Sequence, residues 1–311
     1  MGTQGQVQLW GEEVESGDGS AGTRGDIALG TSSWSHRGWV GPFYPPGTRP
    51  AGFLGYYSRR FPVVEADVTY YRVPSREMIS GWVERTPPGF RIAAKFPRSV
   101  VHAGSGPLPD ARKLLTADAG GRDLDGFLEA MEGLGARVGP LLIQLPRFSV
   151  REFREPGPLL ERLARFLQRL PSTFRYAVEV RNTDWIQPPL LELLRECRSA
   201  LVMAEFPGMD HPWTRGLGEE VLTTDICYVR LVGDRRATEA KTTLFDQEVH
   251  QSQSLVEQWA DWIVRMASSE REVLVFANNH FAGHGPATVR RLAAALADRG
   301  GEVREPCGGA S

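Results

Sequence analysis

Charged side chains interrupt several apolar, strand-like runs of this sequence. They are four acids and three bases: Glu65, Asp67, Glu179, Glu205, Lys95, Arg181 and Arg230. Because burying an unpaired charge costs much free energy, the near balance of signs predicts that these groups form ion pairs. Charges that stay available in a pocket act chemically, since a carboxylate moves a proton and a lysine or arginine stabilises an anion. We therefore predict Glu65 and Glu179 as acid–base residues and Lys95 as a catalytic cation, with a glycosidase carboxylate pair as the alternative for the two glutamates.

These residues lie in a chain in which strand-like runs alternate with stretches of helical spacing. The predicted strands are Ile27–Ser32, Val63–Tyr71, Arg91–Phe96, Pro140–Leu145, Arg175–Arg181, Ala200–Phe206, Ile226–Val232 and Val273–Asn278. The predicted helices are Phe53–Phe61, Ser75–Arg85, Leu124–Arg137, Pro158–Leu170, Pro188–Arg198, Gln251–Ala267 and Pro286–Arg299. Eight strands separated by helices favour an α/β fold of one domain, a TIM (β/α)8-type barrel. A doubly wound open sheet is the alternative, although no glycine-rich dinucleotide fingerprint follows the first strand.

Residue alternation predicts which way the charged side chains point. In the second strand Val64 and Ala66 alternate with Glu65 and Asp67, so the two acids share one face. The outer face of a barrel packs against helices and should be apolar, which predicts that the charged residues point inward. They stand near the C-terminal ends of their strands, where barrel enzymes gather their catalytic groups. We therefore predict ligand-binding residues at a shared mouth: Asp67, Gln144, Arg181, Glu205 and Arg230.

Loops that follow strands add aromatic and histidine candidates to this mouth. They are Trp34, His36, His102 and Trp185. Such side chains can stack on a sugar or a base, and loops at this end of a barrel are often functional. His280 and His284 are four residues apart, but glycines make their segment a loop rather than a helix face, so we predict no metal site. A divalent metal held with the nearby carboxylates is the alternative, and the cofactor stays open.

The composition is that of an ordinary globular protein, with 311 residues of which 41% are hydrophobic and 24% charged. No apolar run approaches the roughly 18–20 residues that cross a bilayer, and the start of the chain lacks a signal-peptide pattern. The net charge of -2 gives no overall attraction to nucleic acid, and three cysteines argue against a disulfide framework. We therefore expect a cytoplasmic monomer without a membrane partner, with one domain over residues 26–300 and flexible tails over 1–25 and 301–311.

A series of motifs in fixed order carries a family resemblance. The motifs are Gly30–Trp34, Gly41–Pro45, Val64–Pro74, Gln144–Pro146, Glu179–Arg181, Tyr228–Leu231 and Asn278 with Asn279. Over about residues 26–297 the chain resembles the DUF72 family, also called YecE-like. The resemblance implies a TIM barrel and adds Tyr71, Asn278 and Asn279 to the binding site. The sequence departs from the family pattern at Asn182 and Val232, where the family often carries histidine. These two differences weaken a metal or acid–base role at those positions.

The sequence is compatible with three functions. The leading hypothesis is an enzyme, a hydrolase or an isomerase or lyase, that binds a small polar or anionic molecule, including a phosphate-bearing one, at the barrel mouth. The second is a nucleic-acid binding protein or a metal-dependent phosphoester-processing protein, because the family resemblance extends at the level of fold to the endonuclease IV barrel. The third is a non-catalytic ligand-binding scaffold, which predicts a fully paired inner network without an open cavity.

Overall fold

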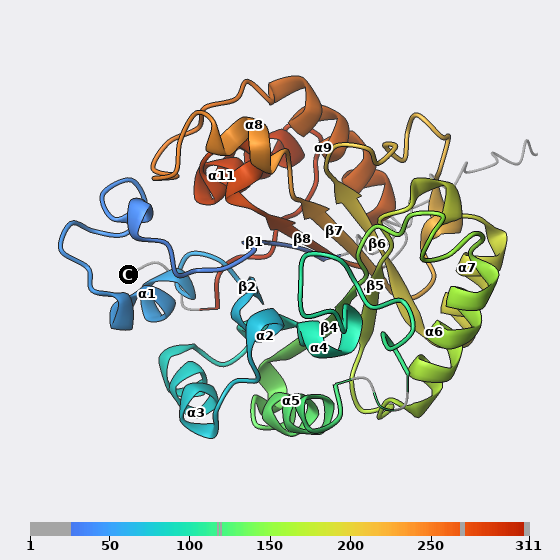
Figure 1. Ribbon diagram of the computed structural model, residues 1–311. Helices are drawn as coiled ribbons and strands as arrows, with labels where there is room; N and C mark the ends of the chain where they lie inside the picture. Colours follow the sequence, from blue (N-terminus) through green and yellow to red (C-terminus); the bar gives the residue numbers. More distant parts are fainter. Residues whose placement is uncertain (1–25, 117, 119, 268–270, 308–311) are drawn as a thin grey trace, which may run out of the picture.

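Eight parallel strands lie at the centre of the described part of the computed structural model, residues 26–116, 118, 120–267 and 271–307. Figure 1 shows helices arranged around these strands. The strands are β1 (Ile27–Thr31), β2 (Val63–Ala66), β3 (Arg91–Lys95), β4 (Val138–Gln144), β5 (Tyr176–Glu179), β6 (Ser199–Glu205), β7 (Ile226–Leu231) and β8 (Glu272–Ala277). Their order is β1-β8-β7-β6-β5-β4-β3-β2, and the two edge strands β1 and β2 lie beside each other. Each strand overlaps a predicted one, and the predicted single-domain TIM-type barrel is confirmed.

The seam between β1 and β2 is joined by few main-chain hydrogen bonds, and a tyrosine hydroxyl bridges it. Ser33 donates its N–H to the carbonyl oxygen of Glu65 at 2.8 Å. The Tyr57 hydroxyl accepts the N–H of Thr31 at 2.7 Å and lies 3.1 Å from the carbonyl oxygen of Val63. A Cβ atom at Gly30 would lie 2.0 Å from that same carbonyl oxygen. The barrel therefore closes here because Gly30 has no side chain and Tyr57 supplies hydrogen bonds that the backbone does not.

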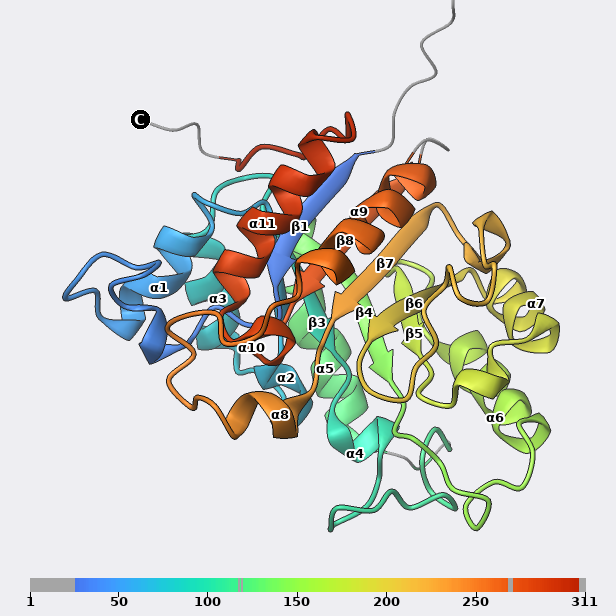
Figure 2. The same ribbon diagram turned by 90° about the horizontal axis from the view of Figure 1, so that it is seen from above.

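Helices follow most of the strands, and some cover the outside of the barrel (Figure 1) while others lie at its C-terminal end (Figure 2). They are α1 (Pro50–Tyr57), α2 (Val68–Tyr71), α3 (Arg76–Arg85), α4 (Arg98–Val101), α5 (Arg122–Glu132), α6 (Gly157–Arg169), α7 (Pro188–Glu196), α8 (Arg235–Glu239), α9 (Gln253–Ala267), α10 (Asn279–Ala282) and α11 (Gly285–Ala297). Local chemistry fixes their starts: Ser75 accepts the N–H of Met78 before α3, and prolines stand in the first turns of α1, α6, α7 and α11. Figure 2 shows α2, α4 and α8 at the end toward which the strands point.

The second strand is shorter than predicted, because the chain turns into α2 after Ala66 and does not continue to Tyr71. The Thr69 side chain explains the turn. Its hydroxyl accepts the N–H of Lys95 at 3.0 Å and lies 2.8 Å from the carbonyl oxygen of Lys95. A side chain thus takes the place beside β3 that the main chain of a longer strand would occupy, so the predicted alternation stops at Asp67.

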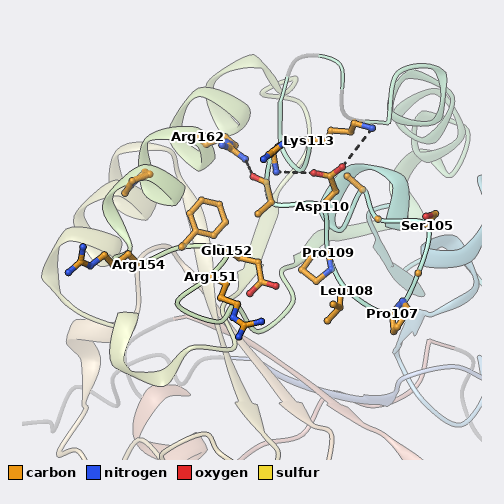
Figure 3. Close-up of a pocket in the computed structure, with 17 residues that line it drawn as sticks. Ser105, Pro107, Leu108, Pro109, Asp110, Lys113, Arg151, Glu152, Arg154 and Arg162 are labelled. Carbon is orange, nitrogen blue, oxygen red and sulfur yellow. Dashed lines mark hydrogen bonds and ion pairs between the residues drawn. The ribbon is translucent and has the colours of Figure 1, made fainter.

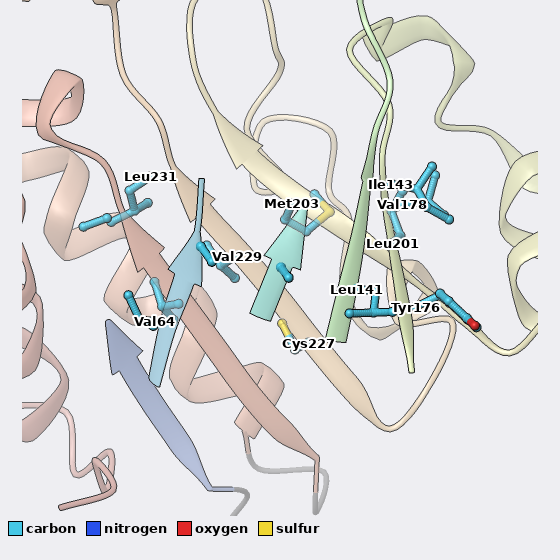
Figure 4. Packing of buried hydrophobic residues seen from close by; sticks show 14 of the residues in the cluster. Val64, Leu141, Ile143, Tyr176, Val178, Leu201, Met203, Cys227, Val229 and Leu231 are labelled. Atoms are coloured by element: carbon cyan, nitrogen blue, oxygen red, sulfur yellow. The ribbon is translucent and has the colours of Figure 1, made fainter. Parts of the chain in front are cut away.

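The strands carry two layers of buried side chains. The inner layer includes Ala28, Val63, Ala93, Leu142, Ala177, Val202, Ala204, Tyr228 and Leu274. The outer layer, part of which Figure 4 shows, includes Val64, Leu141, Ile143, Val178, Leu201, Met203, Val229 and Leu231. The helices pack on this outer layer, to which α9 contributes the fully buried Trp259 and Trp262. Near the C-terminal ends of the strands, charged residues replace the small apolar ones of the inner layer.

Of the two expected tails, only the first part of the C-terminal one lies within the described residues. Residues 1–25 and 308–311 lie outside the described residues. Residues 301–307 follow α11, and within them Val303 forms a β-bridge with Ile27 of β1 and Arg304 forms ion pairs with Asp26 and Glu272. In the described ranges no helix is long and apolar enough to span a lipid bilayer.

Candidate functional site

Arg230 is the centre of a buried polar network at the C-terminal end of the barrel. It points inward from β7, and 1% of its surface is exposed. Its Nε and Nη2 atoms donate to the two carboxylate oxygens of Glu65 on β2, each at 2.8 Å. Its Nη1 atom donates to Oε1 of Gln144 on β4 at 3.0 Å and forms an ion pair with Glu179 on β5. One guanidinium therefore joins four strands, as the planar fork of arginine allows.

A second group of charged side chains lies between this network and solvent. The Nζ atom of Lys95 is 3.5 Å from Oε1 of Glu65 and forms a shorter ion pair with Asp67. The Nε atom of Arg181 donates to Oε1 of Glu179 at 2.7 Å. The side chains of Asp67 and Arg181 are 28% and 29% exposed, whereas those of Glu65 and Glu179 are fully buried. The site thus has a sealed inner tier and an outer tier, Asp67, Lys95 and Arg181, that reaches the surface.

The inner carboxylates are held in their ionised form. Burial alone would raise the pKa of Glu65, but the charges of Arg230 and Lys95 and the hydrogen bonds from Arg230 and Tyr228 lower it to about 2. Burial also opposes ionisation of Glu179, and the charges of Arg230 and Arg181 lower its pKa. The Tyr228 hydroxyl donates to Glu65 at 2.8 Å, and burial raises the pKa of Tyr228 well above its usual value. Both glutamates therefore stay ionised at neutral pH and act only as hydrogen-bond acceptors.

The pKa of Asp67 is shifted in the opposite direction to those of Glu65 and Glu179. Burial raises its pKa above the ordinary value, Lys95 opposes this shift, and the negative charge of Glu65 adds to it. The carboxyl group stands at the first residue after β2, on the side where Glu65 points. A partly exposed carboxyl with a raised pKa exchanges protons with a ligand more readily than a buried one with a lowered pKa.

A pocket of about 380 Å³ opens above these charges. Its lining is Asp67, Tyr70, Tyr71, Lys95, Gln144, Arg181, Phe206, Pro207, Arg230, Val232, Gly233, Arg235, Asn278 and His280. The Arg181 guanidinium lies 5.0 Å from the centre of the Phe206 ring, which fixes its plane at the pocket wall. The volume suits a small molecule, and the polar lining comes from several different strands.

Comparisons with known proteins agree with this architecture. The family model described as "Protein of unknown function DUF72" matches residues 28–308. The chain belongs to the DUF72 family. A 160-residue stretch is 34% identical to the UPF0759 protein YecE of Escherichia coli strain K12 and covers 51% of this chain and 50% of YecE. A match to the UPF0759 protein YunF of Bacillus subtilis strain 168 is 25% identical over 166 residues. The chain therefore spans about half the length of the curated relatives it matches.

Solved structures of DUF72 proteins share the fold over most of the chain. A DUF72 protein of Thermotoga maritima MSB8 is 25% identical, with a TM-score of 0.66, and the match covers 88% of this chain and 99% of that one. A DUF72 protein of Enterococcus faecalis V583 is 20% identical, with a TM-score of 0.61, and the match covers 88% and 98% of the two chains. The family resemblance predicted from the ordered motifs is confirmed.

One predicted inward residue of this DUF72 chain points the other way. Val202 and Ala204 of β6 belong to the inner layer, so Glu205 faces outward. There its Oε2 atom accepts the indole N–H of Trp259 at 3.1 Å and lies 2.7 Å from Nε2 of His211. The prediction that Glu205 lines the mouth is wrong, because these two partners satisfy a carboxylate on the outer face. Phe206 is the residue of this strand end that reaches the pocket.

Several other predicted residues lie near the mouth but outside its pocket. Trp34 packs edge-on against Trp82, and Trp185 stacks on Phe148. His36 packs against Phe245, His102 bonds its own loop through Pro107 and Gly104, and Asn279 accepts the indole N–H of Trp39. The pocket of this DUF72 barrel therefore includes only part of the predicted set: Asp67, Tyr71, Lys95, Gln144, Arg181, Arg230 and Asn278. Glu65 and Glu179 lie directly beneath it.

Residues that the sequence argument missed also take part. Tyr228 is two positions before Arg230 on β7 and shares its inward face, so strand alternation could have identified it. Tyr70, Arg235 and His280 line the pocket from short helices that follow β2, β7 and β8. The short runs that form these helices carried no helical periodicity strong enough to place them.

The histidine pair does not assemble a metal site. His280 contacts Asn278 and Glu239, whereas Nδ1 of His284 accepts the N–H of Ala287 and caps α11. Among the described residues no three His, Cys, Asp or Glu side chains are grouped as metal ligands. The charged side chains at the mouth are instead cations and carboxylates that form ion pairs with one another.

Proposed function

We propose that this DUF72 protein is an enzyme that binds a small anionic molecule, such as a phosphate monoester, at the barrel mouth. The observation that carries the proposal is the Arg181 side chain. Its Nε atom is bonded to Glu179, and its plane is fixed against Phe206. Within the described residues its two terminal nitrogens have no hydrogen-bond partner, and the side chain lines the pocket. A guanidinium fixed in this way offers two parallel donors to a phosphate or carboxylate.

The charge balance of the site supports an anionic ligand. Lys95, Arg181 and Arg230 face Glu65, Asp67 and Glu179, so the site is neutral when all are ionised. Protonation of Asp67 removes one negative charge and leaves the pocket with a surplus positive charge. A bound anion raises the pKa of a neighbouring carboxyl, so binding is linked to proton uptake.

Asp67 is the residue we assign to proton transfer. The two oxygens of Glu65 are engaged by Arg230, Lys95 and Tyr228, and those of Glu179 by the two arginines. These buried glutamates would position Arg230, Arg181 and Lys95 rather than exchange protons. The acid–base role predicted for Glu65 and Glu179 moves in this proposal to Asp67, with Lys95 as the cation beside the reacting group.

Calorimetric titration and thermal shift with inorganic phosphate and a panel of phosphate monoesters and carboxylates test the proposal. Arg181→Gln removes the exposed donors, and we expect its affinity for a binding anion to fall about tenfold or more, as for one lost charge-assisted hydrogen bond. Arg299→Gln is the matched control, because the side chain of Arg299 is 26% exposed and is also paired with a carboxylate.

Two results would overturn the proposal. One is an anion affinity that is unchanged in Arg181→Gln. The other is binding that Arg198→Gln weakens instead, because Arg198 lines a hollow of similar volume, about 380 Å³, at the opposite end of the barrel. Turnover of the bound ester, followed by phosphate release or by chromatography of the product, separates the enzyme from a non-catalytic scaffold. Asp67→Asn should bind the ester and fail to turn it over.

A further inference from the structure

We infer that the anion at the mouth is one nucleotide of a single-stranded nucleic acid, whose adjoining nucleotides run across Tyr71 into a cationic groove beside the barrel. This inference rests on the proposed anion site and names its substrate class. It is carried by three hollows that share lining residues, by the charge of the outermost one, and by an exposed aromatic ring between them.

The outermost hollow is a groove of about 1040 Å³. The loop after α4 forms one wall, and the segment that leads into α6 forms the other. Figure 3 shows Arg154 and Arg162 on one side of this space and Ser105 and Pro107 on the other. Cations outnumber carboxylates in its described lining, which contains Arg112, Lys113, Arg151, Arg154 and Arg162 with Asp110 and Glu152.

The carboxylates of the groove are already engaged. Asp110 accepts the N–H of Arg112 at 3.0 Å and lies 3.7 Å from Nζ of Lys113. Glu152 accepts the N–H of Ser149 at 2.6 Å. In the described part of the chain, Arg151 and Arg154 form no ion pair, and both are exposed. The groove therefore presents unneutralised positive charge, which is the requirement for phosphate backbone binding.

Half-buried Arg162 and buried His102 hold the two walls of the groove in place. Nη1 of Arg162 donates to the carbonyl oxygen of Ala111 at 2.5 Å, and its guanidinium lies over Phe153. His102 is buried and contacts the backbone of Gly104 and Pro107. The shape of the groove is thus fixed by hydrogen bonds, because Arg162 and His102 hold the loop that forms one of its walls.

The groove is continuous with the mouth. Tyr70 and Tyr71 line both the mouth pocket and a middle hollow of about 580 Å³. Residues 103–105 line both that middle hollow and the groove. The middle hollow adds Arg72 and Arg98, and its acid, Asp123, accepts a hydrogen bond from Ser99 at 2.7 Å. A chain of phosphates leaving the mouth would therefore meet arginine along its whole path.

Tyr71 stands at the junction of the mouth pocket and the middle hollow. Its side chain is 78% exposed and contacts Tyr70 edge-on at a ring separation of 5.3 Å. A ring so exposed contributes little to the core, and in a cationic path it offers a face for a base to stack on. A mouth pocket of about 380 Å³ is too small for a base pair with its flanking helix, which favours a single strand over a duplex. An acidic polypeptide has no bases for Tyr71 to stack on.

Fluorescence anisotropy with labelled oligothymidylate and oligouridylate of about 12 nucleotides, a length typical of one single-strand site, tests the inference. The double variant R151Q/R154Q should weaken binding about tenfold or more at low salt and reduce the slope of log affinity against log salt by about 1.4, for two lost phosphate contacts. Tyr71→Ala should weaken binding roughly 5- to 150-fold through lost stacking and leave that slope unchanged. The matched control is R59Q/R290Q, two exposed arginines that line none of the three hollows.

The outcomes distinguish this inference from the proposed function. Equal weakening in the control, equal binding of a duplex or of polyglutamate, or no binding of either single strand at about 50 mM salt would overturn it. If phosphate still binds at the mouth in an Arg181-dependent manner while single strands do not bind, only this inference fails. If single strands bind through Arg151 and Tyr71 while Arg181→Gln has no effect, the proposed mouth site fails, and with it the placement of a nucleotide there.

Discussion

Ion-pair networks occupy both ends of this barrel, and in the described residues each balances three cations against three carboxylates. At the mouth they are Lys95, Arg181, Arg230, Glu65, Asp67 and Glu179. At the base they are Arg91, Arg175, Arg304, Asp26, Asp225 and Glu272. A hollow of about 380 Å³ adjoins each network. Neither the balance of charge nor the size of the adjoining space distinguishes the two ends.

Depth of burial does distinguish them. At the base, the side chain of Asp225 is 76% exposed and that of Asp26 is 47% exposed, and Arg304 joins the segment after α11 to the residue before β1. At the mouth, Glu65 and Glu179 are fully sealed around Arg230, and neutral partners from Gln144 and Tyr228 complete the network. Sealed charges cannot relax into water when a partner is removed, so the stability of the mouth depends on its ion pairs more than that of the base does.

The largest expected effect is the removal of the central cation at the mouth. Arg230→Met leaves Glu65 and Glu179 buried without their main partner, and we expect the free energy of unfolding to fall by about 3–5 kcal/mol. Arg304→Met at the base should cost about 1 kcal/mol or less, because Asp26 is 47% exposed and Glu272 keeps Arg91 and Arg175 as partners. Urea unfolding at neutral pH, followed by circular dichroism, measures both.

Arg230→Lys covers the case in which the methionine variant does not fold. It keeps the charge and loses the two-pronged contact with Glu65, so its stability should fall between those of the wild type and the methionine variant. Equal losses in the mouth and base variants would mean that burial does not separate the two networks.

A smaller effect is expected in the acid dependence of stability. The pKa of Glu65 in the fold is about 2, below its ordinary value of 4.5. The stabilisation is therefore present above pH 4.5 and is lost as the pH falls toward 2, and it amounts to about 3 kcal/mol by linkage. Unfolding of the wild type should consequently become easier over this range, whereas Glu65→Gln should show a flatter profile from a lower starting stability. The surface variant Glu161→Gln is the control and should follow the wild type, and a Glu65→Gln profile parallel to the wild type would contradict the buried ion pair.

Strand alternation predicted most of the inner network but not its exceptions. Glu65, Gln144, Glu179 and Arg230 stand where a period of two within an apolar strand places them. Glu205 has the same local pattern and points outward, because Trp259 and His211 from distant segments supply its hydrogen bonds. A polar residue that interrupts a strand therefore predicts a buried partner, and only the tertiary structure shows on which face that partner lies.

The outer part of the site was less accessible to sequence reasoning. The predicted strand to Tyr71 ends at Ala66, since the Thr69 hydroxyl replaces the main chain beside Lys95. That turn places Tyr71 at the rim of the pocket. The cationic groove combines the loop after α4 with the segment before α6, and neither segment has a charge pattern that predicts the other. Sites made by two loops depend on how the barrel brings them together.

The smallest expected effect on stability belongs to Asp67, the mouth carboxyl that reaches solvent. Because its pKa is raised in the fold, ionised Asp67 disfavours folding above that pKa, and stability gains only when the group is protonated at lower pH. Asp67→Asn should therefore change the free energy of unfolding at neutral pH by no more than about 1 kcal/mol, toward greater stability. The same substitution should reduce the pH dependence of phosphate binding, since wild-type affinity falls as the pH rises through the pKa of Asp67, and only the titration of phosphate itself should then remain. Titration calorimetry at a series of pH values measures that difference. A pH dependence in Asp67→Asn equal to that of the wild type would assign the linked proton to another group, and Asp67 would then have only a structural role, like the ion pairs at the base.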